Sequence, residues 1–204
     1  GLALFSNTTG NKNVAVGQQA LYANTTADNN IAVGYDALRF NTTGSANVSV
    51  GKDSLKANTT GSWNIALGYN ALDANTTGTY NVALGTSSLT TATTASHNTA
   101  VGADALGSTT TGANNTGIGS AALYANTTGA SNVAVGYFAL KTATTAVFNT
   151  ALGVSAMELT TTGAQNTAVG YSALYANTTG QYNVGIGRSA LGANTTGTRN
   201  IAIG

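Results

Sequence analysis

The chain has 204 residues, of which only 6% are charged, and its formal net charge is +1. A chain so close to neutral lacks the basic surface that binding to nucleic acid or to an anionic membrane requires, so we expect neither partner. Cysteine is absent, which excludes disulfide bonds and thiolate metal sites, and no apolar run approaches the ~20 residues of a membrane-spanning helix.

One pattern recurs along the whole chain. It first closes at Gly17, and a glycine then follows every 17 residues up to Gly204, so that twelve segments of 17 account for all 204 residues. We number the positions of each segment 1 to 17. Position 17 is always Gly, position 13 is always Asn, positions 8 and 9 are always Thr, and position 4 is Leu in all segments except one, which has Met157. Self-similarity at a short fixed period is typical of solenoids.

In chain order, the first segment begins with positions 2 to 5 around Leu4, where we predict a short strand. The Asn-Thr-Thr-Gly run that follows is rich in turn formers and predicts a return turn. Val14 and Val16 then lie on one side of an alternating run and Ala15 on the other, which predicts a second strand. We expect Leu4, Val14 and Val16 to fill the interior.

The sequence therefore predicts an all-β fold, a parallel β-solenoid of twelve 17-residue coils that forms one repeat array over residues 1–204. Burial of three aliphatic side chains yields only about 5–9 kcal/mol, whereas ordering 17 residues costs on the order of 17–34 kcal/mol, so a coil is stable only between neighbours. Because both ends fall at segment boundaries without an atypical cap, we interpret the array as a segment of a longer fibre. The residues expected to stack in axial ladders are Asn13, Asn30 and Asn47, Leu21 and Leu38, and Val16 and Val33.

The run Asn-Val-Ala-Val-Gly at 13–17, with variants at 64–68 and 200–204, resembles the repeat of YadA-like trimeric autotransporter adhesin heads. The longer unit Gly-Tyr-x-Ala-Leu-x-x-Asn-Thr-Thr-Gly is similar to repeats in tail-fibre proteins of phages and large viruses. The resemblance covers all twelve segments. It implies a left-handed β-roll, three chains side by side, and an extracellular location on a bacterial cell surface or in a virion tail fibre.

Small residues recur at positions 3 and 15, where Ala3 and Ala15 have few replacements in later segments. On a face outside the core, small side chains would let another chain approach closely, which favours a homotrimer or a self-assembled fibre. The alternative is that alanine merely suits a narrow coil.

No catalytic constellation is visible, so we do not expect an enzyme, a metal or a cofactor. The single histidine, His97, occupies a variable position without an acid or nucleophile fixed beside it. Asp36 and Asp53 share position 2 of adjacent coils, but two ligands are far fewer than the six to eight oxygens around Ca²⁺. Lys52 and Arg39 could instead neutralise them.

Aromatic side chains are the best candidates for ligand binding. Trp63, Tyr80 and His97 occupy position 12 in three successive coils and should form an outward column, with Tyr69 and Tyr35 nearby. A further group of tyrosines lies in segment 11. Aromatic rings on a polar, uncharged surface suit a host-surface glycan or protein.

We interpret the chain as a structural and adhesive fibre segment that acts as an extended spacer with multivalent host-surface attachment. One alternative is a dedicated surface for glycans or matrix proteins. A second alternative is an ice-binding solenoid, because Thr8 and Thr9 recur in every coil.

Overall fold

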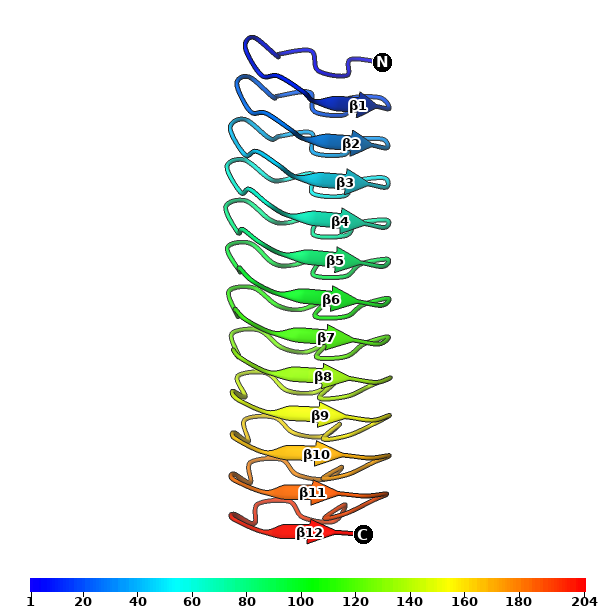
Figure 1. Ribbon diagram of the computed structural model, residues 1–204, viewed down its shortest axis with the longest axis vertical. Helices are drawn as coiled ribbons and strands as arrows, with labels where there is room; N and C mark the ends of the chain where they lie inside the picture. The colour runs from blue at the N-terminus through cyan, green and yellow to red at the C-terminus, as the bar shows by residue number, and fades with distance from the viewer.

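The computed structural model describes residues 1–204 as one uninterrupted stack of coils, with the chain ends at opposite ends of the stack (Figure 1). Each coil contributes one three-residue strand and no helix, so no segment offers the long apolar helix that would cross a membrane. The predicted all-β parallel β-solenoid is confirmed. Its strands are β1 (Val14–Val16), β2 (Ile31–Val33), β3 (Val48–Val50), β4 (Ile65–Leu67), β5 (Val82–Leu84), β6 (Thr99–Val101), β7 (Thr116–Ile118), β8 (Val133–Val135), β9 (Thr150–Leu152), β10 (Thr167–Val169), β11 (Val184–Ile186) and β12 (Ile201–Ile203).

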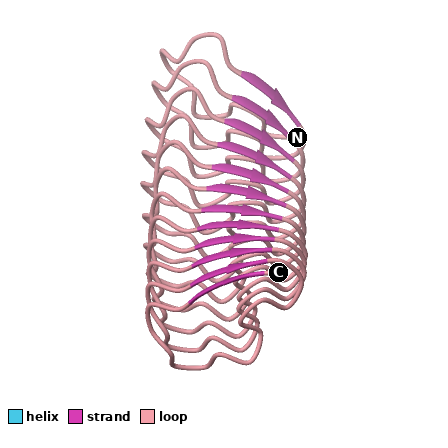
Figure 2. Cartoon of the chain, turned by 60° about the horizontal axis from the view of Figure 1, so that its bottom comes forward, coloured by secondary structure: helices cyan, strands magenta, loops and turns pink.

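The twelve strands form a single parallel sheet in sequence order. Each strand pairs with its copy 17 residues away, so that Val14 faces Ile31 and Val16 faces Val33. The backbone N–H of Val14 donates to the carbonyl of Asn30 at 2.8 Å, and equivalent bonds continue up to Val184, whose N–H donates to Asn200. Like residues therefore lie in columns along the axis, as the period predicts, and the strands form one band along one side of the coil (Figure 2).

The second predicted strand, at positions 2 to 5, is wrong. Positions 1 to 6 form consecutive turns, in which Gln19 and Leu21 have φ angles of 59° and 51°. The left-handed residues turn successive amides in alternate directions. The N–H of Leu21 donates to the next coil, at Ala37, whereas the N–H of Tyr22 bonds within its own coil. Extended backbone cannot make this alternation, so the segment is a turn layer and not a strand.

The side of the strands that faces the core is the opposite of the predicted one. In the ten internal coils Leu at position 4 (Met157 in one coil) and the residue at position 15 are fully buried, as Leu72 and Ala66 are, whereas Ile65 and Leu67 are about 40% exposed. The predicted interior location of Val14 and Val16 is therefore wrong. The core consists of leucine and alanine columns, and the columns of Val16 and Val33 lie on the outer face.

The narrow spacing between the sheet and the turn layer explains this inversion. A Cβ atom added at Gly117, which occupies position 15, would lie 3.3 Å from Cγ of Leu106. Since leucine already fills the space beneath the strand, only Ala, Ser or Gly fits above it. Ala3 and Ala15 are thus residues of the core and its edge within one chain, and the prediction that they form an interface between chains is wrong.

The one internal coil with serine at position 15 keeps the hydroxyl satisfied inside this core. Ser49 Oγ donates to the carbonyl of Ser54 at 2.8 Å and also contacts the Ser54 hydroxyl. The two polar replacements therefore compensate each other.

Glycine at position 17 allows the closest approach between coils. Gly51 has φ of 131°, a region that favours glycine, and a Cβ atom added there would lie 2.5 Å from the carbonyl oxygen of Gly68. The same conflict recurs along the column, because each glycine lies against the glycine of the next coil.

Candidate functional site

The asparagines at position 13 form an unbroken ladder inside the solenoid. Asn30 illustrates the pattern: its N–H donates to Oδ1 of Asn13 at 2.9 Å, and its Nδ2 donates to the carbonyl of Gly44 at 2.9 Å. Its own Oδ1 accepts a 2.9 Å bond from the N–H of Asn47. Each buried amide is thus satisfied by the adjacent coils, which explains why no segment replaces it.

A second asparagine ladder, at position 7, is interrupted. Asn24 Nδ2 donates to Oδ1 of Asn7 at 2.9 Å, and the pattern continues through Asn75. Four coils have another residue at this position, namely Ala92, Thr109, Ala143 and Thr160. Two buried asparagine oxygens have no hydrogen-bond partner, Asn75 Oδ1 and Asn126 Oδ1, and both precede a coil with alanine.

The paired threonines have different roles. The hydroxyl at position 8 donates to the carbonyl of the same position in the next coil, as Thr8 does to Thr25 at 2.9 Å and Thr59 does to Thr76 at 3.0 Å. The threonines at position 9, such as Thr60, are exposed. Only one threonine column is therefore free to meet solvent, so a two-column array does not form.

The predicted column of Trp63, Tyr80 and His97 is present on the surface. The rings of Trp63 and Tyr80 stack with centroids 6.3 Å apart, and those of Tyr80 and His97 stack at 5.1 Å. Trp63 and Tyr80 are more than half exposed. Because the rings cover one another, the column presents mainly ring edges to solvent, and the His97 ring makes no hydrogen bond to an acid or nucleophile.

Tyr35 and Tyr69 do not join this column. Both occupy position 1, beyond the C-terminal end of a strand, whereas Trp63 precedes β4. They flank Lys52, whose Nζ lies 5.9 Å from the centroid of Tyr35 and 5.3 Å from that of Tyr69. The five aromatic candidates therefore form two groups at opposite ends of the strands.

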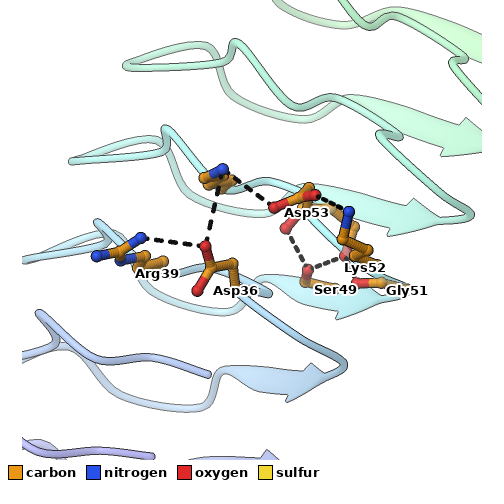
Figure 3. Close-up of polar contacts among 8 residues, drawn as sticks. Asp36, Arg39, Ser49, Gly51, Lys52 and Asp53 are labelled. Atoms are coloured by element: carbon orange, nitrogen blue, oxygen red, sulfur yellow. Dashed lines mark hydrogen bonds and ion pairs between the residues drawn. The ribbon is translucent and has the colours of Figure 1, made fainter. Parts of the chain in front are cut away.

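Next to this second group, charged residues from coils 3 and 4 form a network (Figure 3). Asp36 Oδ2 lies 3.1 Å from an Arg39 guanidinium nitrogen and 3.7 Å from Lys56 Nζ. Asp53 binds Lys56 at 3.1 Å and Lys52 at 3.2 Å. No group of three metal-ligating side chains gathers anywhere in the chain. The two aspartates are thus paired with cations, which is the alternative that the sequence left open.

The network shifts the pKa values of its members. Burial alone would raise the pKa of Asp53, but hydrogen bonds from Lys56 and Lys52 outweigh burial and lower it. The hydrogen bond to Asp53 raises the pKa of Lys56. Burial raises the pKa of the nearby Asp73 carboxyl, and Lys56 only partly offsets this effect.

The only cleft of the molecule lies farther along, on coils 10 to 12. Its volume is about 400 Å³, and the residues that line it include Glu158, Tyr171, Tyr175 and Gly192. The sequence pointed to tyrosines in this segment, but not to Glu158 or Gly192. The available signal was the small residue at position 5, where neighbouring coils carry large side chains.

The outer face of the sheet exposes apolar side chains along the length of the stack. Positions 14 and 16 carry Val, Ile or Leu in all coils, except for threonine at position 14 in four of them. Ile31, Ile65 and Val133 are each about 40% exposed, and no part of the chain covers them. Comparison of the chain with protein-family models, with curated proteins and with solved structures found no match.

Proposed function

We propose that the chain is a structural and adhesive segment of an extracellular fibre, an adhesin head or a tail-fibre shaft, in which three copies pack side by side. In this proposal the coils wind left-handed, in keeping with the repeat that the sequence resembles. The observation that carries the proposal is the continuous apolar outer face of the sheet.

The shape of this face, rather than its area, favours an interface between copies. Twelve strands at ~4.8 Å spacing, each three residues long at ~3.3 Å, give roughly 570 Å². This area lies near the upper end of the apolar patches that monomers expose, about 300–600 Å², and below the roughly 800 Å² per partner of a standard interface. The occupant that fits best is another copy of this chain, because its face has the same length and the same strand spacing.

The axial ladders support the mechanical part of the proposal. Asparagine side chains, threonine hydroxyls and backbone amides all bond from one coil to the next, so bending or stretching the stack would strain many bonds together. A stack of this kind holds whatever lies at its end at a fixed distance.

The mass in solution tests the proposal. We expect analytical ultracentrifugation to give three times the mass of the 20.1 kDa chain. The variant Ile31→Thr/Ile65→Thr/Val133→Thr should weaken the assembly at unchanged fold, because four coils already carry threonine at this position. The matched control is Thr26→Ser/Thr60→Ser/Thr128→Ser in the same three coils, at exposed position 9. A folded wild-type monomer, or a trimer equally stable in the triple variant, would contradict the proposal.

A second candidate function is attachment through the stacked column of Trp63 and Tyr80, which are exposed on a surface of low charge. If this column binds a host-surface partner, Trp63→Ala/Tyr80→Ala should reduce attachment to cells while the mass stays unchanged. Equal attachment by the variant and the wild type would leave the chain as a spacer.

A further inference from the structure

We propose that the free face of the Trp63 indole is a stacking site for one neutral pyranose ring of a glycan. The ring of Tyr80 is covered on both faces, because Trp63 stacks on one side at 6.3 Å and His97 on the other at 5.1 Å. Trp63 has a stacking partner on one face only, and it is 59% exposed. Sugar binding at this face rests on the second candidate function, attachment through the column, and supplies its chemistry.

The space over Ala46 has about the height of one ring. Ala46 occupies position 12 in the coil before Trp63, and its side chain is a single methyl group. The next longer side chain of the column belongs to Asn29, two coils from Trp63, which is about 9.6 Å at the strand spacing. A ring midway between them would lie ~4.8 Å from Trp63, within the range of about 4.5–7 Å for stacked rings. A ligand ring there would extend the column by one member, as Tyr80 does on the other side.

The fold does not require a ring at position 12. Trp63 has φ of 61°, in the left-handed region that bulky residues disfavour. Ala46 makes the same turn with φ of 58°. Since a methyl group suffices for the turn and the indole is mostly exposed, neither the local conformation nor the core explains the tryptophan. An exposed ring held in a disfavoured conformation favours a role in binding.

The polar groups beside this space are free to bind sugar hydroxyls. The amide of Asn29 is exposed and bonds to no group of the chain. Ser45 Oγ accepts the N–H of Asp28 at 3.1 Å, and its own hydrogen has no acceptor. Asp28 accepts the N–H of Asn11 through Oδ1 at 2.6 Å, which leaves Oδ2 free. Such groups bond to the O–H groups at the edge of a pyranose, while the C–H groups on its flat side contact the electron-rich indole face.

The charge around the site favours a neutral sugar. Asp28 is the only charged residue at positions 11 and 12 of coils 2 to 4. Its carboxylate would repel an acidic sugar. Ammonium ligands are recognised by cages of several aromatic rings, whereas only one ring face is free here.

The same order of residues recurs once, five coils farther along. Phe148, which is 60% exposed, follows Ser131 and Asn114 at position 12, as Trp63 follows Ala46 and Asn29. Position 11 of those coils carries only alanine or valine, so the hydroxyl and the carboxylate are missing there. We therefore expect a sugar to bind more weakly at Phe148 than at Trp63.

The test uses Trp63 as its own reporter, because it is the only tryptophan of the chain. We expect its fluorescence to change with at least one of methyl β-glucopyranoside, lactose, cellobiose and diacetylchitobiose at millimolar concentrations. Ala46→Tyr should weaken binding of that sugar about tenfold, because the new ring takes the place of the ligand. The variant should fold, since Tyr80 occupies the same position of a nearby coil. The matched control Ser131→Tyr adds the same ring at position 12 of coil 8 and should leave the response of Trp63 unchanged.

An unchanged fluorescence with all four sugars would overturn the proposal. So would equal losses of binding in Ala46→Tyr and Ser131→Tyr, or a larger response to glucuronic acid or to tetramethylammonium than to any neutral sugar. Attachment to cells separates this result from the second candidate function. If Trp63→Ala/Tyr80→Ala reduces attachment and Ala46→Tyr does not, the column binds its partner through another surface, and only the sugar site is wrong.

Discussion

The side-chain amide of Asn75 donates a 2.8 Å hydrogen bond to Oδ1 of Asn58, whereas the Oδ1 of Asn75 itself has no partner. The next coil has Ala92 at this position, so the donor that other coils supply is missing there. The interruption leaves a buried acceptor unsatisfied, which costs free energy.

We expect that restoring the ladder stabilises the chain. In Ala92→Asn/Ala95→Gly the new amide would donate to Asn75, and the glycine would make room for it, since a Cβ atom at the equivalent Gly10 lies 2.5 Å from Asn7 Oδ1. The expected gain in the free energy of unfolding is about 1 kcal/mol, measured by urea titration. The equivalent double substitution Ala143→Asn/Ala146→Gly should stabilise the chain by a similar amount. A loss of stability at both sites would contradict this reasoning.

The asparagine ladder at position 13 should tolerate substitution much less well than the ladder at position 7. Asn81→Ala removes the acceptor of the Asn98 N–H, at 3.1 Å, and the donor to the Ala95 carbonyl, at 2.8 Å. Two buried groups are left unpaired, so we expect a loss of about 2–4 kcal/mol. The control Thr77→Ala changes an exposed side chain of the same coil and should alter stability by no more than about 0.5 kcal/mol. Thermal melts of the two variants should therefore separate clearly.

The orientation of the strands gives a third prediction. Ala66→Val adds two methyl groups at a fully buried site above the leucine column, and overpacking of this kind costs about 1–3 kcal/mol. The neighbouring Ile65→Val removes one methylene from the outer face and should change the free energy of unfolding of the dissociated chain only slightly. If Ala66→Val were tolerated and Ile65→Val destabilising, the interior would lie on the other side of the strand.

The charged network predicts opposite pH effects for two aspartates. The pKa of Asp73 is raised on folding, so its ionisation opposes the folded state at neutral pH, and the effect disappears below the unfolded pKa, where both states are protonated. Asp73→Asn should therefore raise the melting temperature at pH 7 and leave it unchanged near pH 3, which lies below the ordinary carboxyl pKa of about 4.

The ionisation of Asp53 has the opposite effect on the stability of the folded chain. Its pKa is lowered on folding, so it contributes stability above the unfolded pKa and loses it as the pH falls through the folded value. Asp53→Asn should lower the melting temperature at pH 7, and the difference from wild type should shrink on acidification. Thermal melts of both variants and the wild type over the acid range check the two signs. A difference in melting temperature from wild type that stayed constant at all pH values would contradict them.

The period and the alternation of the sequence were sufficient to predict the coil, the strand at positions 14 to 16 and the register, but not the turns at positions 2 to 5, where a strand was expected. They could not tell which side of the strand faces inward. Val14 and Val16 are the larger residues and were expected inside, but the turn layer lies too close to the sheet for them. The deciding signal was at position 15, which holds only Ala, Ser or Gly and never a larger residue.

The turn layer itself leaves a weak trace in the sequence. Position 2 often carries Asn, Asp or Ser, and Asn and Asp tolerate positive φ, but Leu21 and its equivalents adopt φ of 48° to 54° although leucine disfavours it. Stacking on eleven identical turns overrides the local preference. The aromatic column at Trp63 could be predicted from the spacing alone, because position 12 carries a ring in three successive coils.

The glycine column at position 17 has a consequence for the length of the protein. Since each coil presents the same edge above and below, removal of residues 86–102 would bring Gly85 against Gly119 and rejoin matching neighbours throughout. Unequal recombination between copies of the repeat could thus trim or extend the rod in increments of ~4.8 Å without opening a gap. A deletion that is not a multiple of 17 residues would place side chains against the glycine column, so the length of the rod can change only by whole coils.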